Sequence, residues 1–355
     1  MNWNQTPASG TKLLQPAERP LPHFAGYLLT GPRFVRCRTT RTIDTVNETT
    51  TPHHTHLQRL LDAARNSPPI PTAVVHPVDE ESLVGVAAAS QAGLITPVLV
   101  GPEAKIRAAA EAAAVTLDNC EIIPVQHSHA AAAKAVELVH AGRVAALMKG
   151  SLHTDELMRA VVAGLRTERR ISHVFAFDVP NYARPLFITD AAINIRPDLD
   201  AKRDIVQNAI DLALALGIDT PKVAVLSAVE TVNPRIQSTL DAAALGKMAD
   251  RGQITGGLVD GPLAFDNAVS PTAARIKHIV SPVAGQADIL VVPDLESGNM
   301  LAKQLEYLGG AEGAGVVLGT RAPIALTSRA DDTTSRLASC ALAKLMVRHR
   351  EALLV

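Results

Sequence analysis

The sequence predicts an α/β protein with two αβα domains whose sheets are mainly parallel. From His56 onward, short apolar segments alternate with segments of helical length, which is typical of strand–helix–strand units. The apolar segments, such as 72–75 and 144–148, lack polar alternation, as expected for strands buried on both faces. The 355 residues are 47% hydrophobic and 19% charged, which is enough to fill two cores.

The first 55 residues differ from the rest. They are rich in proline, threonine and arginine and show no sustained hydrophobic periodicity. We therefore predict that residues 1–55 form a poorly ordered N-terminal extension. The histidines at its end, including His53, His54 and His56, are interpreted as solvated side chains rather than metal ligands.

The elements of the first domain follow in order. Hydrophobic periodicity predicts helices and continuous apolar runs predict strands. The predicted helices are 57–64, 80–92, 103–114, 129–141 and one from about 154 to 165. The predicted strands are 72–75, 96–100, 121–123 and 144–148.

The pattern changes near Arg166, where a hairpin is predicted. Its strands are 173–177 and 185–189, joined by a turn at 181–184, so the second sheet should be mixed. Further strands are predicted at 222–227, 256–259 and 288–292, and helices at 199–216, 235–249 and up to Tyr307. Residues 309–315 read as a flexible glycine-rich loop, followed by strands at 315–319 and 323–326 and a helix running to Leu354.

The pattern of the last helix is similar to that of the helices in the first half of the chain. We therefore predict a first αβα domain made of residues 56–166 with 322–355. Residues 167–321 are predicted to form a second αβα domain inserted into the first.

Composition excludes several classes of function. Lys plus Arg (34) balances Asp plus Glu (35), which gives no reason to expect nucleic acid or an anionic membrane as a partner. No apolar run reaches the roughly 18 residues of a membrane helix, and the N-terminus lacks a signal-peptide core. The three cysteines are widely spaced, which favours a cytoplasmic protein without a metal site. The phosphate-binding motifs GxGxxG at a helix start and GxxxxGK[ST] are absent.

The strongest candidate site lies between residues 315 and 336. Here an apolar strand ends and Ser328, Arg329 and Asp331 precede a helix. Ligands collect at the carboxyl ends of strands in α/β proteins, and helix starts favour anions. The alternative is that Ser328 or Thr327 only caps the helix, with the acidic side chains complementing the helix dipole.

Other polar side chains follow strand ends in the same way. Ser151 and Thr154 follow the strand 144–148, and Arg159 lies one to two turns into the next helix. Asp294 and Asn299 follow the strand 288–292. Each of these can bind substrate at a cleft, but each can also cap a helix, fix a turn or, for Arg159, remain solvated.

Several motifs together resemble the phosphate acetyl/butyryltransferase family. They are Asp260–Leu263 with Asp266, Thr189–Ala192 with Asn194, Pro293–Leu295 with Gly298 and Asn299, and Ser328 with Arg329. The likeness covers roughly residues 73–345 and keeps the motif order. It implies two αβα domains facing each other across a cleft, a layout like that of isocitrate and isopropylmalate dehydrogenases. It also implies a homodimer or higher homo-oligomer.

The resemblance implies the reaction acyl-CoA plus phosphate giving acyl phosphate plus CoA. Coenzyme A is then a substrate, and no cofactor or metal is expected. The resemblance places Ser328 and Arg329 in the active site and makes Arg159 a ligand of the substrate anion. We expect the partners to be small-molecule substrates only.

The sequence departs from the acetyltransferase branch at one position. That branch has a catalytic aspartate seven residues after the serine, where this chain has Ser335. The run 327–331 looks more like the butyryltransferase branch. Asp331 is therefore our candidate general base, with Asp332 as its rival. Arg329 and Arg159 are assigned to phosphate, and Ser328 to the oxyanion or phosphate. Ser151, Thr154, Asp294 and Asn299 are assigned to substrate binding.

Two other functions fit the same layout. A metal- and NAD-dependent decarboxylating dehydrogenase would need clustered aspartates and a nucleotide loop, neither of which the sequence provides. A non-catalytic acyl-CoA sensor or partner protein is supported only by Ser335. The sequence leaves the acyl-chain length open.

Overall fold

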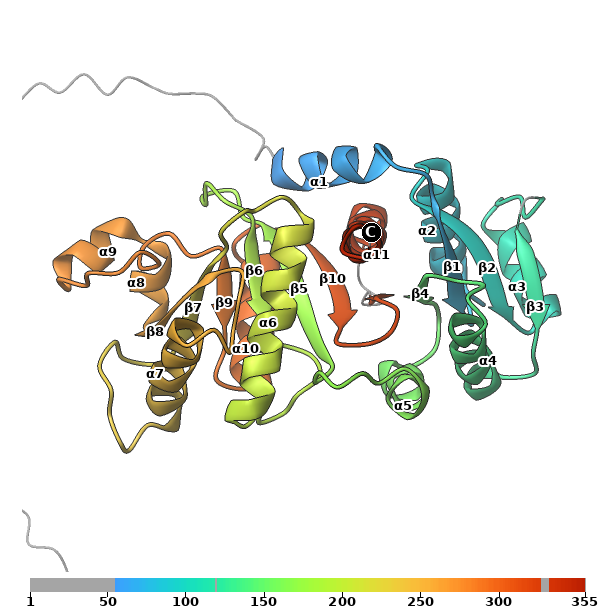
Figure 1. Ribbon diagram of the computed structural model, residues 1–355. Helices are drawn as coiled ribbons and strands as arrows, with labels where there is room; N and C mark the ends of the chain where they lie inside the picture. Colours follow the sequence, from blue (N-terminus) through green and yellow to red (C-terminus); the bar gives the residue numbers. More distant parts are fainter. Residues whose placement is uncertain (1–54, 119, 327–331, 355) are drawn as a thin grey trace, which may run out of the picture. The chain divides into compact units, whose positions relative to one another are not determined.

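A single mixed sheet of eleven strands runs through the structure (Figure 1). The strand order is β3-β2-β1-β4-β11-β10-β5-β6-β9-β7-β8. The computed structural model describes residues 55–118, 120–326 and 332–354. These residues belong to one compact unit, Thr50–Val355. Apart from Thr55, the predicted N-terminal extension lies outside the described residues, as do Ser328, Arg329 and Asp331.

The bounds of the strands agree with the predicted apolar runs to within a few residues at most positions. They are β1 Ile70–Val75, β2 Ile95–Gly101, β3 Glu121–Pro124, β4 Ala146–Lys149, β5 Ser172–Asp178, β6 Leu186–Thr189, β7 Lys222–Leu226, β8 Leu258–Leu263, β9 Ile289–Val291, β10 Glu312–Leu318 and β11 Ile324–Ala325.

The helices also follow the predicted periodic segments. They are α1 Thr55–Arg65, α2 Glu80–Gln91, α3 Glu103–Ala112, α4 Ser128–His140, α5 Thr154–Gly164, α6 Leu199–Ala215, α7 Gln237–Asp250, α8 Phe265–Val269, α9 Pro271–Ile276, α10 Leu295–Tyr307 and α11 Thr333–Ala352. The short helices α8 and α9 have no counterpart in the sequence prediction.

The predicted pair of separate sheets is wrong, because the strands form one continuous sheet. The outer strands pair in parallel, from β3 through β11 at one end and from β6 through β8 at the other. In the middle, β10 pairs antiparallel with both β11 and β5, and β5 pairs antiparallel with β6. The predicted hairpin of β5 and β6 is confirmed. The short pairing of β10 with β11 joins what the sequence suggested were two sheets.

The predicted flexible loop at 309–315 is also wrong in its second half. Glu312–Gly315 forms the start of β10, where Gly313 pairs with Phe177 and Gly315 with Phe175. Glycine disfavours strands, but pairing with a neighbouring strand overrides that local tendency.

Aspartates start four of the helices. Each carboxylate accepts a hydrogen bond from the backbone N–H three residues later, which satisfies one of the free donors of the first turn. The pairs are Asp79 with Ser82, Asp198 with Ala201, Asp294 with Ser297, and Asp332 with Ser335. The acidic residues therefore decide where α2, α6, α10 and α11 begin.

The long C-terminal helix α11 packs against α1, α2 and β10 (Figure 1). A buried lysine anchors it. Lys344 donates from Nζ to the carbonyl oxygens of Ser67 and Gly93, at 2.7 and 2.9 Å. Burial lowers the pKa of this amine, which is held by neutral carbonyl groups. These bonds fix α11 to the chain segments that lead into β1 and β2.

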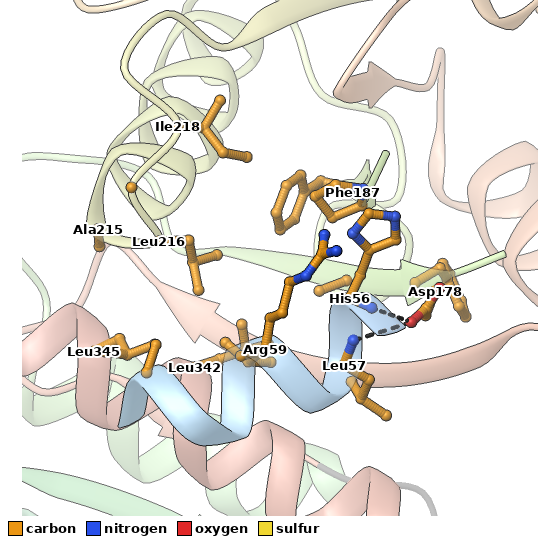
Figure 2. Close-up of a pocket in the computed structure, with 16 residues that line it drawn as sticks. His56, Leu57, Arg59, Asp178, Phe187, Ala215, Leu216, Ile218, Leu342 and Leu345 are labelled. Carbon is orange, nitrogen blue, oxygen red and sulfur yellow. Dashed lines mark hydrogen bonds between the residues drawn. The ribbon is translucent and has the colours of Figure 1, made fainter. Parts of the chain in front are cut away.

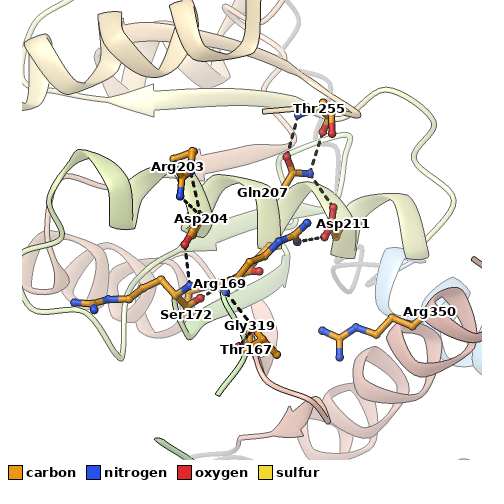
Figure 3. Close-up of polar contacts among 12 residues, drawn as sticks. Thr167, Arg169, Ser172, Arg203, Asp204, Gln207, Asp211, Thr255, Gly319 and Arg350 are labelled. Carbon is orange, nitrogen blue, oxygen red and sulfur yellow. Dashed lines mark hydrogen bonds and ion pairs between the residues drawn. The ribbon is translucent and has the colours of Figure 1, made fainter. Parts of the chain in front are cut away.

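The connection between α5 and β5, residues 166–171, is tied to its surroundings on two sides (Figure 3). Thr167 donates from Oγ1 to the carbonyl oxygen of Gly319, at 2.9 Å. Arg169 forms an ion pair with Asp211 on α6. This connection and the turn after β10 therefore meet near the predicted domain boundaries at 166/167 and 321/322.

Candidate active site

A cavity of about 410 Å³ lies where α5, α10, α11, β5 and β10 meet. Two of the predicted substrate-binding residues, Thr154 and Asn299, line this cavity. Asp332, the rival general base, and Ser335 line it as well. The structure thus brings together parts of the predicted site that are far apart in the sequence.

The predicted catalytic residues Ser328, Arg329 and Asp331 lie outside the described residues. The chain positions on either side are Leu326 and Asp332, and both line the cavity. Leu326 donates its backbone N–H to the carbonyl oxygen of Gly315 on β10, at 3.1 Å. The segment that carries the catalytic assignment is therefore bounded at both ends by cavity residues.

Asn299 reaches the cavity because α10 approaches the loop after β6 closely. A Cβ on the neighbouring Gly298 would lie 2.6 Å from Cγ2 of Val292 and 3.0 Å from Cβ of Ala191. Glycine at 298 is therefore required for this contact. The amide nitrogen Nδ2 of Asn299 lies 3.4 Å from the carbonyl oxygen of Ala191, within reach of a hydrogen bond. Close packing thus sets the position of Asn299.

Ser151 does not line the cavity. Its Oγ accepts a hydrogen bond from the backbone N–H of Val78 at 3.0 Å and lies 3.4 Å from Oγ of Ser82. It ties the end of β4 to the segment between β1 and α2. Its predicted role in substrate binding remains a prediction.

Asp294 and Arg159 do not line the cavity. The carboxylate of Asp294 accepts hydrogen bonds from the N–H and Oγ of Ser297, at 2.9 and 2.8 Å, and the backbone bond is the largest influence lowering its pKa. It caps α10, as the alternative interpretation allowed. The side chain of Arg159 is 71% exposed and lies 3.7 Å from Asp155.

A buried carboxylate organises the loop after β6. Asp190 is 2% exposed and accepts hydrogen bonds from the backbone N–H groups of Ala192, Ile193 and Asn194 and from Nδ2 of Asn194, at 2.6–3.1 Å. Burial raises its pKa, although these hydrogen bonds oppose the shift. The motif at 189–194 therefore builds the loop on which α10 and Asn299 rest.

The sequence interpretation missed several residues of the cavity wall. Phe175 and Phe177 on β5 contribute an apolar wall, while Lys303 and Glu306 on α10 contribute a polar one. Lys303 Nζ lies 2.7 Å from Oε2 of Glu306. Asn299, Lys303 and Glu306 are spaced as i, i+4 and i+7 on one helix face, so this spacing could have revealed the polar wall.

Two helix starts reach the cavity. Thr154 is the first residue of α5, and Asp332 and Ser335 belong to the start of α11. The free N–H groups and the dipole at a helix start favour a bound anion such as phosphate. The cavity therefore combines two helix starts with an apolar wall, while Glu306, Glu312 and Asp332 add carboxylates to its lining.

A second cavity, of about 500 Å³, is larger but lacks this chemistry (Figure 2). It lies among α1, α6, α11 and strands β5 and β6, and its wall is mostly apolar. Asp178 accepts hydrogen bonds there from the backbone N–H groups of His56 and Leu57, at 2.7 and 3.0 Å (Figure 2). None of the predicted site residues lines it.

Comparison with known proteins decides the family. The family model described as "Phosphate acetyl/butaryl transferase" matches residues 124–344. A phosphate acetyltransferase from Rhizobium meliloti is 64% identical over 297 residues, which cover 83% of this chain and 94% of that protein. The chain belongs to the phosphate acetyl/butyryltransferase family.

Two further relatives extend this result. A phosphate butyryltransferase from Clostridium acetobutylicum is 43% identical over 78% of this chain and 93% of that protein. The crystal structure of a branched-chain phosphotransacylase from Enterococcus faecalis V583 is 31% identical, has a TM-score of 0.69, and covers 79% of this chain and 100% of that chain. The fold described above is therefore that of the phosphotransacylases.

The comparisons confirm the predicted family and the predicted acyltransferase class. They do not support the two alternatives, a decarboxylating dehydrogenase and a non-catalytic sensor. Of the two curated relatives above, the one with the acetyltransferase name has the higher identity, although the run 327–331 looked more like the butyryltransferase branch.

The described cysteines are poorly suited to carry an acyl group in this family's reaction. Cys340 is buried, and burial raises the pKa of its thiol to about 12. Its Sγ lies 3.7 Å from Sδ of Met148. Burial also raises the pKa of Cys120, and neither residue lines the 410 Å³ cavity. Cys37 lies outside the described residues.

Within residues 55–118, 120–326 and 332–354, no group of three or more His, Cys, Asp or Glu side chains is placed to hold a metal ion. Within the same ranges, no helix combines the length and the apolar character needed to cross a membrane.

Proposed function

We propose that this chain transfers an acyl group directly between coenzyme A and phosphate, in the reaction acyl-CoA plus phosphate giving acyl phosphate plus CoA. The observation that carries the proposal is the 410 Å³ cavity. The starts of α5 and α11 offer an anion site, β5 offers an apolar wall, and the segment 327–331 joins two cavity residues. A phosphate and a short acyl group need these two environments side by side.

The chemistry can be written for the direction that makes acyl-CoA. The CoA thiol loses its proton to Asp331 while its sulfur bonds to the acyl carbonyl carbon of the acyl phosphate. The tetrahedral centre then collapses and expels phosphate. A free thiol has a pKa of about 8.5, so it is mostly protonated at neutral pH and benefits from a general base.

Charge in this reaction is concentrated on phosphate and on the oxyanion. Arg329 is assigned to phosphate, because a guanidinium group binds phosphate through two parallel hydrogen bonds. Ser328 is assigned to the oxyanion or to phosphate. Thr154 and Asn299 face the same cavity and are assigned to substrate binding. Ser151 and Asp294 keep their predicted role in substrate binding. They would act indirectly, because Ser151 holds the end of β4 and Asp294 caps α10.

Arg159 is retained as a ligand of the substrate anion. Its ion pair with Asp155 joins two exposed side chains, and such pairs contribute little to stability. The side chain can therefore turn away from Asp155 toward a bound phosphate at little cost.

Acetyl is proposed as the preferred acyl group. The support is the acetyltransferase name of the Rhizobium meliloti relative, which is 64% identical, against 43% for the butyryltransferase from Clostridium acetobutylicum.

The test of the function is an assay of the purified full-length chain with acetyl phosphate, CoA and arsenate. An active enzyme forms acetyl-CoA, and arsenolysis of that product consumes acetyl phosphate catalytically. Rates with acetyl-, propionyl- and butyryl-CoA plus phosphate then give the acyl preference. A chain that binds CoA but consumes no acyl phosphate of any length would overturn the proposal.

The enzyme is further proposed to act in the cytoplasm as a homodimer or higher homo-oligomer. The cysteine spacing supports the compartment. Exposed apolar side chains at Phe265, Ile276 and Val280 supply a surface that a second copy can cover. Light scattering on the purified chain measures the mass, and a monomer at all concentrations would contradict the oligomer.

The two-domain division is also retained as a proposal. All strands on one side of the β10–β11 pairing come from residues 56–166 and 322–355, and all strands on the other side come from 167–321. Limited proteolysis should therefore cut first near 166–171 or 319–322, and early cuts inside either part would contradict the division.

A further inference from the structure

A row of three rings runs along one face of β5 beside the cavity. His173, Phe175 and Phe177 alternate along the strand and so share that face. The ring of His173 meets Phe175 edge-on with centroids 4.4 Å apart, and Phe175 and Phe177 stack with centroids 5.5 Å apart. Phe175 is therefore held from both sides.

The outer rings of this aromatic row lie against two glycines of β10. A Cβ on Gly313 would lie 2.5 Å from Cε1 of Phe177, and a Cβ on Gly315 would lie 2.6 Å from Nε2 of His173. The rings fill the space that side chains at 313 and 315 would occupy. The side of the row that faces β10 is therefore tightly packed, which restricts His173 and Phe177 and, through them, Phe175.

Phe175 is the ring of the row that a substrate can reach. It is partly exposed and lines the cavity, whereas His173 is fully buried and Phe177 is 3% exposed. It pairs in register with Gly315, whose carbonyl oxygen accepts the N–H of Leu326. Among the described lining residues, Phe175 is therefore the partly exposed aromatic side chain that an acyl group in the cavity can contact.

The opposite side of the cavity cannot take an apolar chain as well. Asn299, Lys303 and Glu306 line it with an amide and two charged groups. Burying a methylene against these groups would remove an ion pair and an amide from water, which costs free energy even though Lys303 and Glu306 pair with each other. The apolar end of an acyl group is therefore directed to the side of β5.

We propose that Phe175, clamped between His173 and Phe177 over Gly313 and Gly315, is the side chain that limits acyl-chain length in this enzyme. This inference rests on the proposed function. In the wild-type chain the ring leaves room for an acetyl group and excludes longer chains. Each methylene that a pocket accepts or rejects changes kcat/KM by about 10-fold to 200-fold. Removing the ring should therefore be visible as a change in substrate preference.

The experiment measures kcat/KM for acetyl-CoA and butyryl-CoA with phosphate, for the wild type, Phe175→Leu and Phe175→Ala. The expected result is a rise in the butyryl-to-acetyl ratio of at least about tenfold for Phe175→Ala, with Phe175→Leu between it and the wild type. Phe175→Leu keeps an apolar side chain, so it remains informative if the alanine variant folds poorly.

The matched control is Phe187→Leu. Phe187 on β6 is 1% exposed and lines the other, 500 Å³ cavity, so this variant removes a ring without touching the proposed acyl wall. It should lose stability and keep the wild-type ratio. If both Phe175 variants still convert acetyl-CoA and keep the wild-type butyryl-to-acetyl ratio, Phe175 does not limit acyl-chain length. The proposed function is then unaffected. A wild-type chain inactive with every acyl-CoA overturns the function itself.

Discussion

The backbone N–H of Gly315 donates to Oγ of Ser339 at 3.0 Å, and that hydroxyl donates in turn to the carbonyl oxygen of Ser335 at 2.8 Å. The first bond joins the middle of β10 to α11, and the second holds the Ser339 hydroxyl within the first turns of α11. Ser339 is completely buried. The relationship matters for catalysis because Gly315 supports the aromatic wall and the start of α11 frames the cavity.

Ser339→Ala should therefore destabilise the protein and slow the reaction. The N–H of Gly315 would be left buried without a partner, which costs about 1–3 kcal/mol. Denaturant unfolding measures this loss, and kcat should fall because β10 and α11 are no longer tied together. Ser335→Ala is the control. It keeps the backbone carbonyl that accepts the bond, so both quantities should stay near wild type. Equal effects of the two substitutions would contradict the role of Ser339.

Truncation separates the N-terminal extension from α1. Deleting residues 1–50 leaves α1, which begins at Thr55, and should leave the melting temperature and rate essentially unchanged. Deleting residues 1–65 removes the buried Leu57 and Leu61, each worth about 1.5–3 kcal/mol, and deprives Asp178 of two hydrogen-bond donors. Thermal unfolding of both truncated proteins is the measurement. A large drop for the shorter deletion would refute the prediction.

Local patterns predicted most elements because their signals are strong. Strands β1, β2 and β4 are continuous apolar runs, and most helices were predicted from hydrophobic periodicity. The cap of α11 is Asp332 rather than the Ser328 or Thr327 considered from the sequence. The start of β10 could not be predicted in this way. Gly313 and Gly315 are strand residues only because they pair with β5 and because aromatic rings of β5 pack against them. The single sheet has the same origin, since a two-residue strand, β11, joins its halves.

A polar residue that follows a strand end can be placed near a cavity from the sequence. Thr154 and Asn299 are such residues and both line the cavity, while their role in substrate binding stays a prediction. Phe175 was missed because an aromatic residue in a strand looks like core. Asp294 shows why a polar residue at a strand end can be misassigned. A carboxylate that caps a helix and one that binds substrate both follow a strand and precede a helix, so the sequence cannot tell them apart.

His173 should make stability depend on pH in the acidic range. Its burial lowers its pKa from 6.5 to about 3, and within the described structure neither ring nitrogen has a hydrogen-bond partner. In the unfolded chain His173 is protonated below about pH 6.5, whereas in the folded chain it stays neutral down to about pH 3. Stability is therefore lost as the pH falls through this window, by up to about 1.4 kcal/mol per pH unit from this group.

The measurement is urea unfolding of the wild type and His173→Phe between pH 3.5 and 7.5. Phenylalanine keeps a ring against Phe175 and cannot be protonated. The difference in unfolding free energy between the two proteins should shift in favour of the variant as the pH falls. A constant difference across the range would show that His173 does not contribute to acid sensitivity.

Arg329→Gln should raise the KM for phosphate and lower kcat. The substitution removes a charged, bidentate ligand where charge develops in the reaction, and Arg329→Lys should restore activity only in part. Steady-state kinetics with phosphate varied at saturating acetyl-CoA measure both constants. The comparison is Arg159→Gln, whose side chain is 71% exposed and which should raise KM without a comparable loss of kcat. Wild-type kinetics for Arg329→Gln would remove Arg329 from the site.

The general base is tested with Asp331→Asn, Asp332→Asn and Ser335→Ala. Asp331→Asn keeps the shape of the side chain and removes its basicity, so kcat should fall by about 10²–10⁴-fold while CoA binding changes little. Asp332 caps α11 through a 2.8 Å bond from the N–H of Ser335, and asparagine is an equally good cap. Asp332→Asn should therefore keep both stability and most activity. Ser335→Ala should be mild, because a serine hydroxyl does not ionise in the useful range.

The pH dependence of kcat distinguishes loss of a base from loss of structure. Between pH 6 and 9 the CoA thiol, with a pKa of about 8.5, ionises increasingly by itself. The defect of Asp331→Asn should then shrink as the pH rises, because less help is needed to remove the proton. A structural defect would remain constant with pH. If Asp332→Asn shows the pH-dependent loss instead, the base is Asp332. If all three variants keep near wild-type rates at pH 6, no carboxylate in this segment acts as the base, and the thiol proton must pass to water or to phosphate.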